Sequence, residues 1–524
     1  RVSSAELLLI ALVLAVGGGL LWRYARVAPA ATGTVAARGA DGAQGNPRTM
    51  VSGASAKAVP TASVPAKSIA VLPFVNMSGD PKNDYFSDGI TEEILNALAQ
   101  VPKLKVAART SAFAFKGKEE DLRKVGEVLD VATVLEGSVQ KSGDEVRITA
   151  QLIDTRSGYH LWSEKYDRKL TSIFAVEDEI SQAIADKLKV QLAGGSGQSL
   201  VAQKAVEPRA HDFYLRGLTL LAVRSVSEAG DAFQQAVKID PDYTQAWAAL
   251  AEAQALLPSY TSGSEETADT HALAAAQHAL ALDPDVALAY VAQGIVYTNQ
   301  MHWADADRAL RRALALAPGD AEAVDQYAQF LYAVGQIEPA LAEIDRALQR
   351  DPLSGVSGAV RAQLLFVLHR DDAALKQIES TLAAHPDGLL GHRIALWVYL
   401  SLHRYPEAER QMRLSSPYHP DVSALLVRGI ADPHLRPSAV EVLETSPALV
   451  DLRHDAIVHA LFLVALRENE HALAVLGEFA VNGDSATPQL LWNRAFDPIR
   501  NDSRFMAVLK KIDLPYTPEK SDTP

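Results

Sequence analysis

The sequence has no cysteine, few aromatic residues and no excess of positive charge. Its 524 residues include 50 Lys and Arg against 64 Asp and Glu, a formal net charge of −14, and only 6% are aromatic. Without cysteine the chain has no disulfide, no thiolate metal site and no cysteine nucleophile. The negative balance disfavours binding to a phosphate backbone, so no nucleic-acid partner is expected.

The common motifs of enzyme and cofactor chemistry are also absent. The sequence has no GxxxxGK[ST] phosphate loop, no HExxH zinc motif and no GxSxG nucleophile elbow. Its fourteen histidines are scattered, and no i, i+4 pair occurs among His369, His385, His392 and His403. Solvated or packing histidines are therefore expected. We predict no catalytic residue, no metal and no cofactor within this chain.

One acidic stretch, NDYFSDGITEEILNAL at residues 83–98, raises the possibility of metal or acid–base chemistry. It places four carboxylates within ten positions: Asp84, Asp88, Glu92 and Glu93. The favoured alternative is the start of a helix. Asp88 or Ser87 would then be the N-cap, with Glu92 and Glu93 in a first turn where the helix dipole favours negative charge. Asp84 would lie outside that helix.

The N-terminal segment contains a long apolar run. No charge lies between Glu6 and Arg23, and Leu7–Trp22 would span roughly 24 Å as a helix at ~1.5 Å per residue. With its flanks this run predicts a transmembrane anchor over 1–26, which contacts the membrane through residues 5–22. A cleaved signal peptide is an alternative, although no small-residue cleavage site comes directly after the run, and a buried helix is another.

The next residues predict a tether but leave the topology open. Residues 27–66 are mostly Ala, Gly, Pro, Ser and Thr, which predicts a disordered linker. Arg23 and Arg26 favour a cytoplasmic location for the residues C-terminal to them, but the charges ahead of the run cannot be compared. The chain begins with Arg1, so either a segment has been processed away or the chain is part of a longer protein.

Residues 67–192 predict a small α/β domain. SIAVLPFVNM is typical of a buried strand, and a helix from about Asp88 to Gln100 has apolar residues at helical spacing. A second strand and helix come next, then three strands whose turns, KSGDE and TRSGY, each contain a glycine that can adopt positive φ. A final helix closes the unit. The order βαβαβββα predicts a mixed sheet covered by helices.

This domain resembles the TolB amino-terminal-like (FlgO-like) family. The resemblance rests on SIAVLPFVNMSGDPKNDYFSDGITEEILNALAQVPKLKVAARTSAFAFKG and VATVLEGSVQKSGDEVRITAQLIDTRSGYHLWSEKYDR, and covers about Lys67 to Leu192. It implies ligand or partner sensing, so a small-molecule ligand is possible in the α/β domain. Relatives lie between a membrane helix and tetratricopeptide repeats, behind a CadC-type winged-helix domain, a class III nucleotide cyclase or a serine/threonine kinase.

After a linker at 193–206, prolines recur at a fixed period. Their spacings are 43, 34, 34, 34 and 34 between Pro241, Pro284, Pro318, Pro352, Pro386 and Pro420. This is the tetratricopeptide period of paired antiparallel helices. With the proline as position 32, position 20 is alanine in all six repeats: Ala229, Ala272, Ala306, Ala340, Ala374 and Ala408. A methyl-sized residue is needed where two helices cross closely.

The array is predicted over 207–482, with a degenerate last repeat. The similarity to tetratricopeptide repeats covers about Glu207 to Asp421 and then fades, although IVHALFLVALRENEHALAVLGEFA still predicts a helical pair. A closing segment and tail are predicted over 483–524. Trp492, Phe496 and Phe505 would cover the exposed last face of the array.

Stacked repeats of this family form a superhelix with a concave groove. Family positions 2, 5, 9, 12 and 13 face that groove, which predicts contacts with a protein or peptide partner. The candidate residues are Asn299, Asp325, Gln329, Tyr332, Gln363, Phe366, Arg393 and Trp397. The alternative is that several of them only pack between repeats. The Lys/Asn pattern that binds a peptide carboxylate in chaperone-binding members is absent.

The sequence as a whole predicts a multidomain chain with one transmembrane helix, a small α/β (mixed-sheet) domain and an all-α tetratricopeptide superhelix. The expected function is a membrane-anchored, non-catalytic binding and sensory scaffold at the bacterial inner membrane, with the part after the anchor in the periplasm. The alternative is the sensory C-terminal half of a larger signalling protein whose effector precedes Arg1. An enzyme within this chain has the least support.

Overall fold

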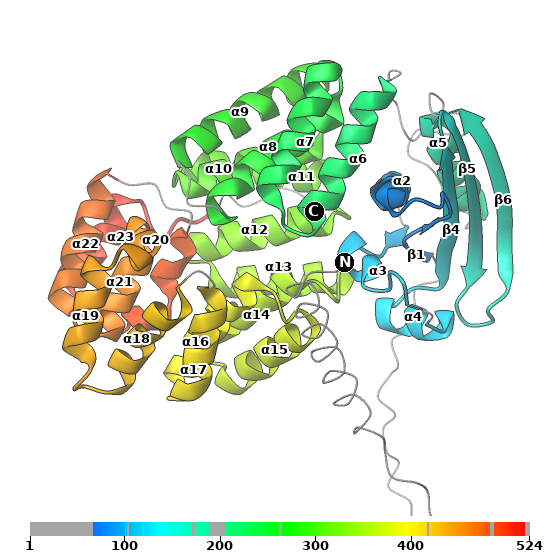
Figure 1. The fold of residues 1–524 in the computed structure, drawn as a ribbon. Helices are drawn as coiled ribbons and strands as arrows, with labels where there is room; N and C mark the ends of the chain where they lie inside the picture. The colour runs from blue at the N-terminus through cyan, green and yellow to red at the C-terminus, as the bar shows by residue number, and fades with distance from the viewer. Residues whose placement is uncertain are drawn as a thin grey trace, which may run out of the picture. The chain divides into compact units, whose positions relative to one another are not determined.

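The structure is a computed structural model, shown in Figure 1. It describes residues 67–99, 101, 104–118, 120–169, 173–187, 206–260, 265–416, 419–482 and 487–518. All of them belong to one compact unit, residues 63–524. The predicted anchor and tether lie outside the described residues. Across the ranges given above, no helix is both long enough and apolar enough to cross a membrane.

The first part of the unit is a mixed β-sheet, as predicted. Its strands are β1 (Ser68–Val71), β2 (Val75–Asn76), β3 (Lys105–Val106), β4 (Thr133–Ser142), β5 (Glu145–Asp154) and β6 (His160–Lys169). The order is β3-β1-β4-β5-β6, and β2 pairs with β4. Pairings among β3, β1 and β4 are parallel, whereas β4-β5-β6 is an antiparallel meander. Gly143 and Gly158, in the two predicted turns, have φ of +59° and +74°.

Helices cover both faces of this sheet (Figure 1). The helices of this part are α2 (Asp84–Ala99), α3 (Arg109–Phe113), α4 (Leu122–Leu129) and α5 (Ile173–Lys187), and the 3-10 turn η1 (Pro81–Asn83) comes directly before α2. One core joins α2 and α5 to side chains such as Ile69 and Ile148. A smaller core joins α4 to Ala70 and Val134 on the other face. The short helix α3 was not predicted from the sequence.

The predicted start of α2 is wrong. The helix begins at Asp84, because Asp80 caps the preceding turn by accepting a hydrogen bond from the Lys82 amide, and Pro81 comes directly after it. Ser87 and Asp88 are therefore not caps but buried residues one turn inside the helix. The Asp84 carboxylate instead accepts a hydrogen bond from Asn76.

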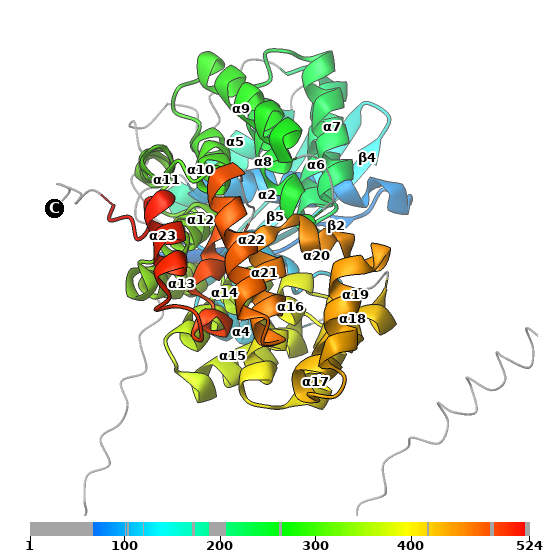
Figure 2. The same ribbon diagram turned by 90° about the vertical axis from the view of Figure 1, so that its left-hand side faces the viewer.

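The second part of the unit is a long all-α repeat array, as predicted (Figures 1 and 2). Successive helices pair as α6 (Pro208–Ala222) with α7 (Val226–Ile239), α8 (Thr244–Tyr260) with α9 (Glu265–Leu282), α10 (Ala287–Asn299) with α11 (Trp303–Leu316), α12 (Ala321–Ala333) with α13 (Ile337–Arg350), α14 (Gly355–Val367) with α15 (Asp371–Ala384), α16 (Leu389–Ser401) with α17 (Tyr405–Ser415), α18 (Pro420–Ala431) with α19 (Arg436–Thr445), and α21 (Ala456–Ala465) with α22 (Asn469–Asn482).

The residues that set the period lie where the repeat physics places them. All six alanines at position 20 are fully buried. The first five prolines lie two residues beyond the ends of α7, α9, α11, α13 and α15. Pro420 is the exception: α17 ends at Ser415, and Pro420 is the first residue of α18. There the missing amide of proline costs no helical hydrogen bond, so this proline begins a helix instead of ending one.

The end of the chain folds back onto the array. After α19 come η3 (Pro447–Leu449) and α20 (Val450–His454), and after α22 come η4 (Pro488–Trp492), η5 (Arg494–Phe496) and α23 (Ser503–Lys511). Phe496 and Phe505 are fully buried beside the last helical pair, with ring centroids 5.5 Å apart. Trp492 does not cover that last face, because it packs on the fourth repeat.

Candidate functional site: the concave surface of the array

The eight predicted groove residues lie on α10, α12, α14 and α16, the first helices of four successive repeats. They differ widely in exposure. Asp325, Tyr332, Gln363 and Phe366 are buried, while Asn299, Gln329 and Trp397 are partly buried. Arg393 is exposed.

Asp325 holds a polar network inside the array. Its Oδ1 accepts a hydrogen bond from the Ser357 hydroxyl at 2.6 Å, and its Oδ2 accepts one from Gln329 Nε2 at 2.7 Å. Burial, helped by the nearby charge of Glu322, raises the pKa of Asp325 to about 7. The Ser357 bond joins α12 to α14, so Asp325 and Gln329 stabilise the stacking of neighbouring repeats.

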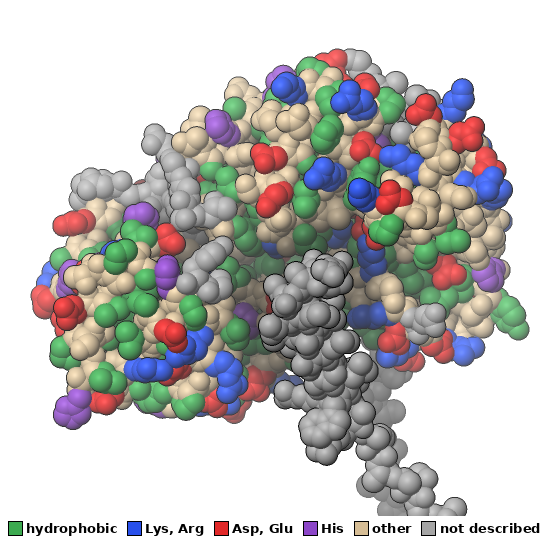
Figure 3. Space-filling view, in the orientation of Figure 1, with side chains coloured by type: hydrophobic (Ala, Val, Ile, Leu, Met, Phe, Trp, Pro, Cys, Tyr) green, Lys and Arg blue, Asp and Glu red, His purple; other side chains and the backbone are tan. Residues whose placement is uncertain are grey.

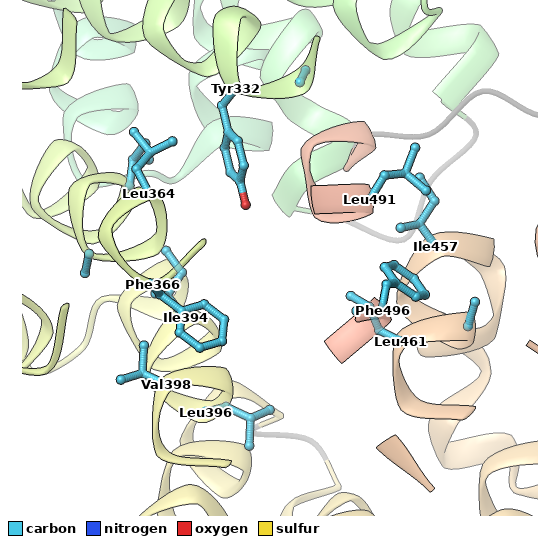
Figure 4. Close-up of a cluster of buried hydrophobic side chains, with 14 of the residues drawn as sticks. Tyr332, Leu364, Phe366, Ile394, Leu396, Val398, Ile457, Leu461, Leu491 and Phe496 are labelled. Carbon is cyan, nitrogen blue, oxygen red and sulfur yellow. The ribbon is translucent and has the colours of Figure 1, made fainter. Parts of the chain in front are cut away.

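The chain's own C-terminal segment covers Tyr332 and Phe366. Figure 4 shows Tyr332 and Phe366 on one side of the buried cluster, with Leu491 and Phe496 of the C-terminal segment on the opposite side. Trp492 Nε1 donates a hydrogen bond to the Ala333 carbonyl at 2.9 Å. The Arg494 guanidinium lies 4.8 Å from the centre of the Phe366 ring and pairs with Asp371. This part of the concave surface is therefore occupied from within the molecule.

Other contacts, made by residues after α23, extend this covering along the array. Trp303 Nε1 donates to the Ile512 carbonyl at 2.7 Å, and Gln336 Nε2 donates to the Tyr516 carbonyl at 3.1 Å. The Tyr332 hydroxyl is buried and has no hydrogen-bond partner among the residues that the structure describes. Burial raises its pKa well above the usual range for tyrosine.

The α/β domain packs on the first repeat through α2 and α6. Gly89 permits the closest approach, since a Cβ at this position would lie 2.7 Å from Leu215 Cβ. Around it, Asp212 accepts hydrogen bonds from the Tyr85 hydroxyl at 2.6 Å and from Lys141 Nζ at 2.8 Å. We call this contact the α2–α6 dock.

The acidic stretch that opens α2 serves this packing. Glu93 is buried and accepts a hydrogen bond from the Tyr214 hydroxyl of α6 at 3.1 Å. Glu92 pairs with Arg109 at 2.7 Å, and Asp88 with Lys116 at 2.5 Å. Burial, together with the charge of Glu92, raises the pKa of Glu93 to about 7. These carboxylates are neither helix caps nor a shared site.

A second contact joins α3 to the turn after the fourth repeat. The Ser111 hydroxyl donates to Asp351 Oδ1 at 2.5 Å and accepts from the Leu353 amide at 2.8 Å. The Ala108 amide donates to the Arg350 carbonyl at 3.1 Å, and Leu353 packs against the smaller core of the α/β domain. We call this contact the α3 dock.

Charged side chains without close partners remain on the concave surface. Glu252 on α8 is buried, and no described residue forms a hydrogen bond with its carboxylate. Burial and the nearby charge of Glu322 raise its pKa to about 8. Arg224, in the loop after α6, lies near the carboxylates of Glu322, Glu252 and Asp325, which raise the pKa of its guanidinium against the effect of burial. Neither residue was predicted from the sequence, although Glu252 occupies groove position 9 of the second repeat.

Arg393 is the groove candidate that stays most open. Desolvation by neighbouring protein atoms lowers the pKa of its guanidinium, while Tyr260 and Asp455 raise it. Among the described residues none forms an ion pair or a hydrogen bond with its side chain. Trp397 lies one turn further along α16, and its ring centroid is 5.1 Å from that of Phe462 on α21. This pair offers a cation beside an aromatic face.

Metal chemistry has no visible centre in the part of the chain that the structure describes, because no group of three or more His, Asp or Glu could hold an ion there. Two histidines of the fifth and sixth repeats have hydrogen-bond partners inside the array. His385 Nε2 lies 2.7 Å from the Leu353 carbonyl, and His392 Nδ1 lies 2.7 Å from Gln411 Oε1. On the face shown in Figure 3, acidic and basic side chains are interspersed.

Comparisons with known proteins give a partial relationship. No family model matches the sequence. Putative adenylate cyclase 3 of Rhizobium meliloti (strain 1021) is 46% identical over 197 residues, which cover 37% of this chain and 34% of that protein. The match thus spans about a third of that relative.

Solved structures with some similarity include two helical-repeat proteins. YrrB, a TPR protein with an unusual peptide-binding site, is 21% identical with a TM-score of 0.26, and the match covers 38% of this chain and 98% of YrrB. PilF of Pseudomonas aeruginosa is 16% identical with a TM-score of 0.31, over 41% of this chain and 95% of PilF. TolB of Acinetobacter baumannii is 18% identical with a TM-score of 0.18, over 24% of this chain and 30% of TolB. Likenesses this weak do not say what this chain binds.

Proposed function

We propose that this chain is a non-catalytic binding and sensory scaffold, anchored in the bacterial inner membrane and exposed to the periplasm. One observation supports a binding role above all. Beside the part of the concave surface that the C-terminal segment covers, α16 presents an exposed Arg393 and, one turn further on, a partly exposed Trp397. A guanidinium without a carboxylate partner, next to a partly exposed indole, suits a peptide that offers an acidic group and an apolar side chain.

Site-specific cross-linking tests this proposal. A photoreactive phenylalanine analogue replaces Trp397 in one chain and Arg308 in another. Arg308 is a suitable control because it is a well-exposed residue on α11. We expect a cross-linked protein at position 397 but not at 308, and we expect Arg393→Glu to reduce its yield at least tenfold. Equal cross-linking at both positions, or cross-linking that Arg393→Glu leaves unchanged, would contradict the proposal.

A second candidate function is supported by the cyclase relative. The proposal is that the chain forms the sensory C-terminal half of a signalling protein, with a cyclase, kinase or DNA-binding effector ahead of it. The 46% identity over 197 residues to a putative adenylate cyclase supports it. The gene sequence upstream of Arg1 tests it directly, because an effector pattern there supports the candidate and a start codon immediately upstream rules it out.

The membrane location has its own test. A reporter enzyme fused after Pro524, active only in the periplasm, should be active in intact cells. Activity from a second reporter, one that works only in the cytoplasm, would contradict the periplasmic assignment. That result would leave the binding proposal in place.

A further inference from the structure

The α/β domain meets the end of α13 close to α3 (Figure 1). A cleft lies there, beside the α3 dock. Its volume is about 620 Å³, which is within the ~300–1,000 Å³ range of small-molecule sites. Lys105, Leu129 and Asp130 line it from the α/β domain. Arg346, Arg350 and Pro352 line it from the array. The cleft exists only because the two parts of the unit are packed together.

The charge of this cleft is opposite to that of the chain. Its described lining holds three cations, Lys105, Arg346 and Arg350, against one carboxylate, Asp130. Asp130 is already used, since Lys105 Nζ pairs with it at 2.6 Å. Arg346 has a partner on its own helix, Glu343, but remains half exposed. Since Lys105 and Arg346 each have a carboxylate partner, Arg350 carries the unpaired positive charge among the described residues that line the cleft.

Arg350 is the unusual member of this set. Among the described residues its side chain has no hydrogen-bond or ion-pair partner, and one guanidinium nitrogen is buried and unpaired. Burial and the neighbouring charge of Arg346 both lower the pKa of Arg350. The charges of Glu343 and Asp320 act in the opposite direction, but neither carboxylate pairs with Arg350. The half-buried guanidinium thus keeps a positive charge beside Arg346, which a bound anion would stabilise. Nothing in the α3 dock itself requires a cation at this position.

We propose that this cleft binds a small anion with at least two negative charges, either a phosphate ester or a di- or tricarboxylate. The guanidinium of arginine matches both groups, because its planar fork donates paired hydrogen bonds to two oxygens. Lys105 on β3 would contribute a point charge from the opposite wall. This site is separate from the concave surface around Arg393, and it does not depend on any partner bound there.

Binding would also strengthen the contact between the two parts of the unit. The anion would bridge Lys105 of the α/β domain and Arg350 of the array, next to the Ser111–Asp351 hydrogen bond. A ligand that binds only the docked state favours that state by mass action. The small molecule would therefore report its concentration as tighter docking of the α/β domain.

Calorimetric titration of the 524-residue chain tests this proposal, with pyrophosphate and citrate as probes and sodium chloride at matched ionic strength as reference. Arg350→Gln removes the charge and keeps much of the side-chain length. Arg312→Gln is the control, because Arg312 is a half-exposed arginine one 34-residue repeat before the cleft residue Arg346 and is not among the residues that line the cleft. We expect one bound anion per chain, affinity at least tenfold weaker in Arg350→Gln, and no change in Arg312→Gln.

Each outcome has a defined meaning. Binding of pyrophosphate but not citrate identifies the ligand as a phosphate compound. Binding of citrate but not pyrophosphate identifies it as a carboxylate. Either result supports the site. A hydrogen-exchange experiment should show slower exchange of the Leu353 amide, which bonds to Ser111, when the anion is present. Equal binding by wild type and Arg350→Gln, or an effect that chloride reproduces at the same ionic strength, would overturn the proposal. Arg350→Gln should keep its thermal stability without anion, because it removes a like-charge contact.

Discussion

Replacing Glu93 with glutamine should stabilise the protein at alkaline pH. The Glu93 carboxyl is buried against α6, and its pKa is raised from 4.5 to about 7. Because the folded state holds this proton more tightly than the unfolded state, the stability that this group contributes is highest at low pH. It is lost as the pH rises from about 4.5 through about 7.

The structure gives a magnitude for this effect. A rise from 4.5 to about 7 corresponds to roughly 3 kcal/mol of unfolding free energy above pH 7, at about 1.4 kcal/mol for each pH unit. Glutamine has nearly the same shape, stays neutral at every pH and can still bond to the Tyr214 hydroxyl. We therefore expect Glu93→Gln to gain up to roughly 3 kcal/mol at pH 8, with a much smaller change near pH 5.

Urea denaturation at pH 5 and pH 8 measures this difference. Glu127→Gln is the control, since Glu127 is an exposed carboxylate on α4 of the same domain, and it should change stability by less than about 0.5 kcal/mol at either pH. The reasoning is refuted if Glu93→Gln loses stability at pH 8, or if its pH dependence equals that of the wild type. Either result would mean that the Glu93 charge has a favourable partner.

Three further changes probe the packing. Gly89→Ala should destabilise the α2–α6 dock by about 1–3 kcal/mol, because the added Cβ would lie 2.7 Å from Leu215 Cβ. The control is Gly477→Ala in α22, where a Cβ would meet no atom within 4 Å, and thermal unfolding should show a gain of up to ~1 kcal/mol. Ala340→Leu should cost at least ~2 kcal/mol, since Ala340 is fully buried at a helix crossing; an unchanged melting temperature would contradict this packing. Trp492→Ala should cost about 3 kcal/mol and speed proteolysis of residues 487–518, and unchanged cleavage there would show that the indole does not hold the segment.

The sequence predicted the features that depend on short-range or periodic constraints. Every alanine at position 20 meets the same helix crossing, so a spacing of 34 residues was enough to place Ala340 in the core. The order of strands and helices came from local patterns in the same way. Such constraints act within one repeat or one hairpin, and a single sequence therefore displays them.

Features that depend on distant partners could not be predicted in this way. The local pattern around Glu93 indicates the first turn of a helix, because its partner Tyr214 lies 121 residues away. The position of Trp492 near the end of the array indicates a cover for the last repeat, yet it bonds to Ala333, 159 residues earlier. Neither contact recurs with a period, so no spacing in the sequence indicates it. The same limit explains why Arg350 was not recognised as a candidate.

The α/β domain is attached to the array at two separated places, the α2–α6 dock on the first repeat and the α3 dock on the turn after the fourth. In a helical solenoid each repeat contacts only its neighbours, so small rotations between repeats can change the pitch of the superhelix. Here the α/β domain bridges the first repeat and the turn after the fourth, so we expect the two docks to resist stretching of the repeats between them. A partner that needs a wider superhelix would therefore have to break the Ser111–Asp351 hydrogen bond first. The α3 dock would then control how far the array can open.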